Sequence, residues 1–170
     1  MTVHRDTTSP KRATVLYLVS HPIQYQAPLL RFVAARASFD LIVGCTSNNN
    51  ISRCDDGFGQ EIAYDVPLLD GYRSFRATPL PLLRALKEAD VVWLHGWRGP
   101  KHLAVVLLGR LGLVRVLIRC DTWSGAYPAT TVWRARARTW LHRFVIRSCS
   151  ASLAIGQRNR TWLTSMGLRD

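Results

Sequence analysis

Short apolar runs alternate along the chain with segments in which apolar residues recur at the spacing of a helix. The first pattern predicts buried strands and the second predicts helices. The strands are expected at 14–19, 39–45, 60–66, 91–94, 113–119 and 151–155. The helices are expected at 25–37, 79–88, 100–111, 131–148 and 157–166. This alternation predicts an α/β fold, namely a Rossmann-like open parallel sheet with right-handed crossovers and helices on both faces.

Polar and aromatic residues follow the first predicted strand directly. That strand is apolar throughout, and the chain then continues with Ser20, His21 and, after a proline, Gln24, Tyr25 and Gln26. In open α/β sheets, ligands bind in the crevice at the carboxyl ends of the strands. The five residues are therefore candidates for substrate binding. The alternative is a packed connector whose His and Tyr bond to backbone groups, and the residues alone leave both readings open.

The fourth predicted strand ends in a similar way. It runs into His95, Gly96 and Trp97, and a proline then begins a helix whose N-terminus favours anions. His95 is a candidate catalytic residue that would contact a substrate hydroxyl or a phosphate, while Gly96 and Trp97 are candidate substrate-binding residues. A lone histidine at a strand end is more often a structural hydrogen-bonding group. Here, however, His21 and His95 fall on the same rim of the predicted sheet.

Two further strand ends add charged residues to this rim. Arg119 and Asp121 follow the fifth predicted strand, and Arg158 follows the sixth. Asp121 is a candidate catalytic residue that would orient an acceptor hydroxyl, but it could equally pair with Arg119 or Arg115. Arg119 and Arg158 are candidate substrate-binding residues. We expect these side chains to converge with the two histidines along one edge of the sheet.

The composition fits one globular domain. Of 170 residues, 48% are hydrophobic and 20% are charged, which is enough apolar material for a sizeable core. Residues 1–12 are expected to form a flexible leader before a domain at 13–170. No apolar run has the length of a membrane span or a signal peptide, so we expect a cytoplasmic protein with reduced cysteines. The Cys and His spacings indicate no metal site.

The net charge of +12 is concentrated in the second half of the chain. Residues 1–90 hold ten basic and nine acidic side chains, whereas residues 91–170 hold thirteen basic and two acidic ones. Such asymmetry indicates an anionic partner rather than a particular fold, although a genome that favours arginine would produce it too. No motif indicates a specific nucleic-acid partner.

The predicted helix at 131–148 carries much of this charge. One face of it carries Trp133, Ala137, Trp140, Leu141, Phe144 and Val145. Arginines occupy the rest of its surface and no acid is present, so the helix is a candidate for peripheral contact with an anionic surface at the inner face of a membrane. The alternative is an ordinary helix whose apolar stripe packs on the sheet.

Several segments taken together resemble one enzyme group. They are LVSHPIQYQAPL at 18–29, DGFG at 56–59 with YDVPLLDGY at 64–72, LHGW at 94–97 and AIGQRNR at 154–160. In this order they resemble the N-terminal, acceptor-side domain of GT-B glycosyltransferases of the family-four-like group. The resemblance covers roughly residues 13–167 of the chain.

The resemblance implies one Rossmann-like half of a two-domain enzyme. Such enzymes transfer a sugar from a nucleotide-sugar to a glycan, lipid-linked or small-molecule acceptor. They usually retain the anomeric configuration and need neither a metal nor a resident cofactor. The resemblance also implies that the C-terminal, donor-binding domain with its E-x7-E motif is absent here, and that the chain alone is inactive. The alternative is a non-catalytic binding module or a truncated remnant. The donor sugar, the acceptor and the pathway stay open.

Overall fold

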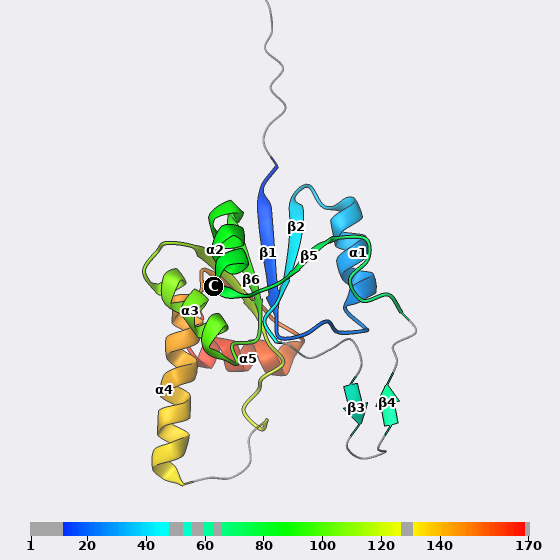
Figure 1. Ribbon diagram of the computed structural model, residues 1–170. Helices are drawn as coiled ribbons and strands as arrows, with labels where there is room; N and C mark the ends of the chain where they lie inside the picture. The colour runs from blue at the N-terminus through cyan, green and yellow to red at the C-terminus, as the bar shows by residue number, and fades with distance from the viewer. Residues whose placement is uncertain (1–11, 48–52, 56–59, 63–65, 127–130, 169–170) are drawn as a thin grey trace, which may run out of the picture.

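The computed structural model describes residues 12–47, 53–55, 60–62, 66–126 and 131–168, and its core is one large sheet (Figure 1). Six parallel strands stand in the order β5-β2-β1-β6-β7-β8. They are β1 (Thr14–Val19), β2 (Asp40–Cys45), β5 (Arg73–Arg76), β6 (Val91–His95), β7 (Arg115–Arg119) and β8 (Ala151–Leu153). The predicted Rossmann-like open parallel sheet is therefore confirmed.

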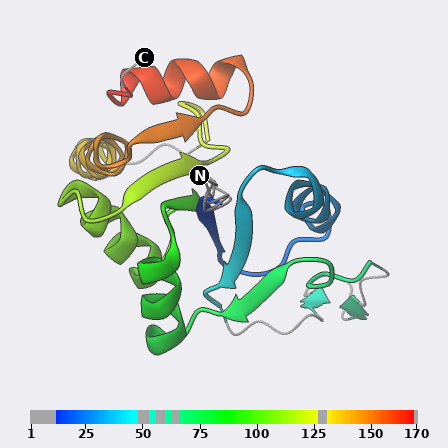
Figure 2. The same cartoon turned by 90° about the horizontal axis from the view of Figure 1, so that it is seen from above.

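Helices cover both faces of this sheet. They are α1 (Ala27–Arg36), α2 (Pro79–Glu88), α3 (Pro100–Arg110), α4 (Val132–Ser148) and α5 (Gln157–Ser165). Seen along the strands, α1 lies on one face, α2, α3 and α4 lie on the other, and α5 lies beyond β8 (Figure 2). The first three helices each begin with a proline in the first turn, where its missing N–H leaves no helical hydrogen bond unmade.

The side chains of strand β1 show why helices pack on both faces of the sheet. Leu16 and Leu18 point to the side of α2, α3 and α4 and join the larger core cluster. Tyr17 and Val19 point to the opposite side and join the smaller cluster under α1. All four side chains are at most 2% exposed. An apolar run without alternation is typical of a central parallel strand that is buried on both sides.

The pattern of apolar runs misplaces one strand of the sheet. It predicts a strand at 60–66, but the structure has a short β4 (Gln60–Ile62) that pairs with β3 (Arg53–Asp55) in a separate antiparallel sheet. The parallel sheet instead takes β5, which pairs with β2 and has the sequence Arg-Ser-Phe-Arg. A single apolar residue suffices for this strand because it lies at an edge, where most of its surface meets water.

The two edges of the sheet differ in charge. At β5, Arg73 pairs with Glu88 of α2 across 2.8 Å. At the other edge, β8 consists of Ala151, Ser152 and Leu153 and carries no charge.

The apolar stripe of helix 131–148 packs on the core only at its carboxyl-terminal end, through Phe144 and Val145. Trp133 and Trp140 of α4 are 66% and 69% exposed, and Leu141 is also exposed. The buried residues are His142, Val145, Ile146 and Ser148, all in the carboxyl-terminal half. The reason is the length of the helix, since its amino-terminal turns extend beyond the sheet while only the last turns cover it (Figure 1).

The predicted leader is described only at its last residue. Arg12 donates hydrogen bonds to the carbonyl oxygens of Ala37 and Phe39 and lies 3.4 Å from the carboxylate of Asp40. Residues 1–11 lie outside the described part of the chain. Among the residues that the structure describes, none of the helices has the length and apolarity that crossing a membrane requires.

Candidate functional site

The strand order reverses direction between β1 and β6. Successive strands β1, β2 and β5 extend the sheet to one side, and β6, β7 and β8 extend it to the other. The connections that leave β1 and β6 therefore run to opposite faces, and a crevice opens between their carboxyl ends. Ser20 and His21 follow β1 at this crevice, and His95 and Gly96 stand at the end of β6.

A cavity of about 310 Å³ lies at this edge of the sheet. It is lined by Ser20, His95, Gly96, Trp97, Arg98, His102, Cys120, Asp121 and Thr122. Three strands and the start of α3 contribute to it. The structure thus brings together five of the predicted site residues, including both candidate catalytic ones.

Gly96 gives the chain a sharp turn at the mouth of the cavity. Its φ is +75°, a conformation that side-chain-bearing residues rarely adopt, and its N–H donates to the Arg119 carbonyl across 2.8 Å. No atom lies within 4 Å of where a Cβ would stand. Glycine is therefore required here by the backbone conformation, while the space above it stays open toward the cavity.

A buried hydrogen-bond chain holds His95. The Tyr17 hydroxyl donates to Oε1 of Gln26 across 2.6 Å, which turns the Gln26 amide nitrogen toward the imidazole. That nitrogen lies 3.2 Å from Nε2 and 3.4 Å from Nδ1 of His95. Since the amide can only donate, the ring nitrogen that accepts from it is unprotonated, and the other one carries the proton.

Gln26 is only 2% exposed. The sequence places it with the substrate-binding residues, but in the structure it touches His95 and Tyr17. Its side chain therefore contacts His95 from within the protein, while its predicted contact with substrate stays a prediction.

The surroundings of His95 favour the neutral form of its imidazole. Burial lowers its pKa most strongly, and the positive charge of Arg119 lowers it further, while the carboxylate of Asp121 opposes this in part. His95 and Arg119 are register partners on adjacent strands, so their side chains share one face of the sheet. A neutral imidazole of this kind can exchange hydrogen bonds with a hydroxyl or a phosphate oxygen.

The loop from β1 to α1 is only partly directed into the cavity. Ser20 lines the cavity, and its hydroxyl lies 2.8 Å from Nδ1 of His21, which is half-buried next to it. Gln24 is also half-buried in this loop, whereas Tyr25 is 71% exposed. The structure thus places His21 on the same rim as His95, and Tyr25 on the outer surface.

Two predicted residues stand beside the cavity wall without lining it. Arg119 ends β7 and acts on His95 through its charge. Arg158, in α5, places its guanidinium 5.6 Å from the ring of Trp123, the residue that follows the lining residue Thr122. Trp97 lines the cavity but also stacks on Trp162 in the core, with ring centroids 6.2 Å apart.

Sequence reasoning misses two buried polar residues at this site. His102 of α3 lines the cavity, is only 1% exposed, and neither of its ring nitrogens makes a hydrogen bond of ordinary geometry. Its burial lowers its pKa. The sequence does contain a signal for His102, because this residue stands at the third position of a helix that starts at the rim of the sheet.

The second missed residue, Asn159, links two strand ends. Its side-chain nitrogen donates to the Thr122 carbonyl across 2.7 Å, and its oxygen accepts from the Ile155 N–H across 2.9 Å. It thereby fixes the cavity-lining segment after β7 against the segment after β8. The sequence draws attention to this stretch, but the charge of the neighbouring arginine directs the prediction to Arg158 instead.

The titratable residues of the described chain do not form a metal centre. No three side chains of the types His, Cys, Asp and Glu stand close enough there to hold an ion. In the same part of the chain Cys45, Cys120 and Cys149 are free thiols, and burial raises the pKa of Cys45 to about 11. The cavity lining itself consists of hydrogen-bonding, charged and aromatic side chains.

No protein-family model matches the chain, and no curated protein matches it in sequence.

Proposed function

We propose that this chain is the acceptor-side half of a GT-B glycosyltransferase, which transfers a sugar from a nucleotide-sugar to a glycan, lipid-linked or small-molecule acceptor. The observation that carries the proposal is the convergence of His95, Ser20 and Asp121 on one cavity at the point where the strand order reverses. The resemblance of residues 13–167 to that enzyme group supplies the reaction class.

The chemistry of the cavity suits a sugar. Sugar hydroxyls both donate and accept hydrogen bonds, and the cavity offers a carboxylate at Asp121, a hydroxyl at Ser20 and a neutral imidazole at His95. A volume of about 310 Å³ stands at the lower end of small-molecule sites and fits a single sugar unit. In this proposal Asp121 orients the acceptor hydroxyl, while His95 contacts the reacting centre.

The donor is a co-substrate in this proposal, and no resident cofactor or metal is needed. The amino terminus of α3 begins at the cavity rim, and Arg98 and Arg119 add positive charge nearby. Helix N-termini and cationic side chains stabilise the negative charge that develops on a leaving diphosphate. A second, donor-binding domain would close over this edge and exclude water.

We also propose that the protein works in the cytoplasm. Cys45, Cys120 and Cys149 are unpaired, and free thiols of this kind are typical of reducing compartments.

Ligand binding tests the proposal directly. The chain is titrated with simple sugars and with a panel of nucleotide-sugars, and binding is followed by saturation-transfer NMR. His95→Ala and Asp121→Asn are each expected to weaken sugar binding by about tenfold, because each removes a hydrogen bond to a charged or buried group. Asp70→Asn is the matched control, since Asp70 is an exposed carboxylate outside the cavity lining.

The same panel of sugars and nucleotide-sugars is then incubated with the full-length protein, and nucleotide release is measured. Turnover that falls in His95→Ala and survives in Asp70→Asn supports the transferase. Sugar binding without any nucleotide release indicates a non-catalytic binding module instead. If neither sugars nor nucleotide-sugars bind, or if both cavity variants bind like the control, the assignment is wrong.

A further inference from the structure

The amino-terminal part of α4 exposes aromatic residues that the sheet does not cover. Trp133 and Trp140 are among the most exposed large side chains of the described chain, and Val132 beside them is exposed as well. Tryptophan normally buries most of its area, so two exposed rings on one helix indicate a surface that binds a partner. The neighbouring α3 contributes the exposed Leu107 and, just past its end, Leu111.

The same surface is strongly basic. Helix α4 carries Arg134, Arg136, Arg138, Arg143 and Arg147. Neither α3 nor α4 contains a carboxylate, and Asp121 is the one acidic residue in the sequence between Asp90 and Asp170. Arginines and tryptophans are intermixed along α4, so this helix exposes both apolar and cationic groups.

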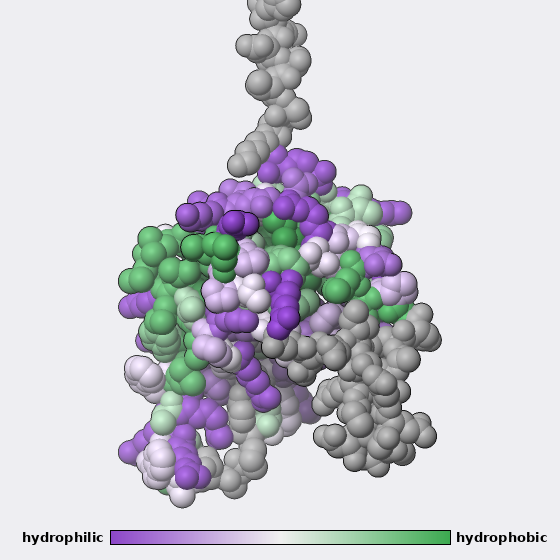
Figure 3. Space-filling view, viewed as in Figure 1, coloured by the Kyte–Doolittle hydropathy of each residue, from purple (hydrophilic) through white to green (hydrophobic). Residues whose placement is uncertain are grey.

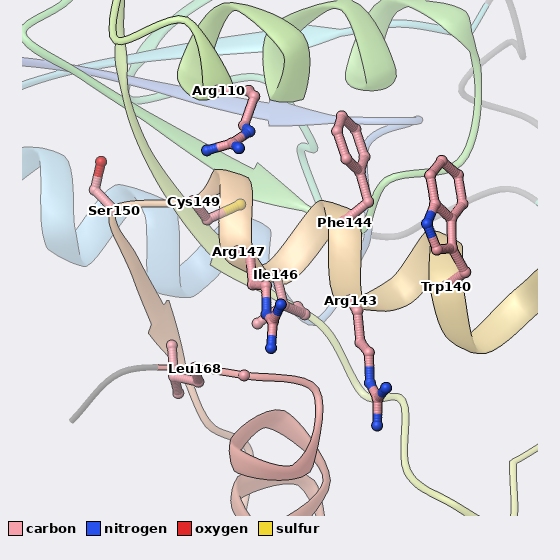
Figure 4. A pocket seen from close by; sticks show the side chains of 10 residues that line it. Arg110, Trp140, Arg143, Phe144, Ile146, Arg147, Cys149, Ser150 and Leu168 are labelled. Carbon is pink, nitrogen blue, oxygen red and sulfur yellow. The ribbon is translucent and has the colours of Figure 1, made fainter.

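A groove along α4 adds a place for anionic groups. Its volume is about 980 Å³, and it is lined by Arg110, Trp140, Arg143, Phe144, Ile146, Arg147, Cys149, Ser150, Gly167 and Leu168. In Figure 4, Arg110 extends from α3, and the rings of Trp140 and Phe144 rise from α4 toward it. These two rings are stacked, with centroids 5.9 Å apart. Arg143 and Arg147 point from α4 toward the opposite side (Figure 4).

Glycine at position 167 makes room for one of these arginines. An ideal Cβ there would lie 2.5 Å from Nε of Arg147, and the φ of Gly167 is +98°. Guanidinium groups hold phosphate through paired hydrogen bonds. Because Gly167, just after α5, has no side chain, the guanidinium of Arg147 can lie next to the backbone there.

The geometry points to an anionic phospholipid membrane as the occupant of the α3–α4 surface. Tryptophan is enriched at membrane–water interfaces, arginine pairs with lipid phosphates, and leucines are favourable where they meet acyl chains. A nucleic-acid backbone would match the arginines but would gain little from Leu107, Leu111 and Val132. Figure 3 shows hydrophobic side chains gathered over α2 and α3 above a largely hydrophilic α4, the mixed character that a membrane surface accepts.

In this arrangement Trp133 and Trp140 lie in the headgroup region, and the arginines of α4 contact lipid phosphates. The contact is peripheral and reversible. It does not depend on the proposed sugar transfer, because the α4 groove and the cavity at the end of β6 have no lining residue in common.

Vesicle sedimentation tests the inference with the chain as it exists. Vesicles of phosphatidylcholine alone are compared with vesicles that contain roughly 30% phosphatidylglycerol. We expect binding to the anionic vesicles, at least about tenfold weaker binding to the neutral ones, and release by salt. The variant Trp133→Ser/Trp140→Ser keeps every charge and should lose about tenfold in partitioning, and Arg134→Gln/Arg136→Gln should lose a similar factor.

A matched control lies on the other face of the sheet. In α1, Phe32 is 57% exposed and Arg36 lies 4.9 Å over its ring, so Phe32→Ser/Arg36→Gln removes an equivalent aromatic–basic pair. This variant should bind anionic vesicles like the unmodified chain, and circular dichroism shows whether all variants are folded.

Three results would overturn the inference. The first is absence of binding to anionic vesicles by the folded chain. The second is an equal loss in the α1 and α4 variants, which would mean that binding is not specific to the α3–α4 surface. The third is self-association that the tryptophan variant abolishes without vesicles, which would assign the surface to a second copy of the chain.

Discussion

The substitution Gln26→Glu tests the hydrogen-bond chain behind His95. Glutamate has the size of glutamine and still accepts from the Tyr17 hydroxyl. However, it replaces the amide N–H, which lies 3.2 Å and 3.4 Å from the two ring nitrogens, by a carboxylate oxygen. We expect the pKa of His95 to rise from below its ordinary value of 6.5 to above it.

The size of the change follows from the distance. Two unit charges about 4 Å apart interact by about 4 kcal/mol at the dielectric constant typical of protein sites, and burial of the new carboxylate offsets part of this. An opposite charge within hydrogen-bond distance commonly changes a pKa by about 1 to 3, and each such unit corresponds to about 1.4 kcal/mol. We therefore expect the pKa of His95 to increase by about 1 to 3.

The substitution also reverses the pH dependence of stability at this site. In the unmodified chain the folded state holds His95 with a lowered pKa, so its contribution is present above pH 6.5 and lost as the pH falls further. In Gln26→Glu the folded state binds the proton more tightly than the unfolded state. The variant should therefore gain stability relative to the parent as the pH falls from about 8 to about 6.

Imidazole NMR titration measures the pKa, and urea unfolding at several pH values measures the stability. Gln26→Leu is the control, because it removes the donor without adding a charge and should raise the pKa of His95 far less than Gln26→Glu does. The reasoning is refuted if Gln26→Glu and Gln26→Leu give the same His95 pKa, since the amide would then not face the imidazole.

Two further substitutions test how the site is held. Asn159→Ala removes the links to Thr122 and Ile155 and should lower the free energy of unfolding by about 2 kcal/mol in urea melts, since each half-buried hydrogen bond contributes about 1 kcal/mol. Thr161→Ala on the exposed side of α5 is its control, and equal losses in the two variants would contradict the linking role. Gly109→Ala would place a Cβ 2.7 Å from Val116 Cγ2 and 2.9 Å from the Ser148 carbonyl, so it should destabilise the chain by about 1 to 2 kcal/mol in spite of the better helix propensity of alanine. Leu107→Ala, at an exposed position of α3, should change the stability by about 0.5 kcal/mol or less, and a stable Gly109→Ala would show that α3 and β7 are further apart than described.

Periodicity predicts most of this fold because the central strands are buried on both faces. β1, β2, β6 and β7 all have apolar runs, and helix boundaries follow from prolines and glycines at their ends. It fails at β5, whose hydrogen bonds to β2 compensate for a polar edge sequence. Periodicity also fails on α4. The sequence shows an apolar stripe there, but it cannot show that the amino-terminal turns of the helix extend beyond the sheet.

The candidate site is predicted in outline and not in detail. A parallel sheet places all strand ends on one rim, so the proximity of His21, His95 and Asp121 follows from topology. The roles within the cavity depend on burial, which the sequence does not reveal. For example, the sequence does not show that the Tyr17 hydroxyl orients the buried Gln26 amide toward His95.

The unequal edges of the sheet bear on how the protein behaves at high concentration. Charged side chains discourage the addition of a foreign strand, and β5 has Arg73 and Arg76 at its two ends. β8 presents three uncharged residues, so nothing on it repels an incoming strand. Because β8 is short and α5 lies beyond it, intermolecular β-pairing is expected to begin at β8 only when α5 moves away, and a lysine introduced into β8 would then oppose it.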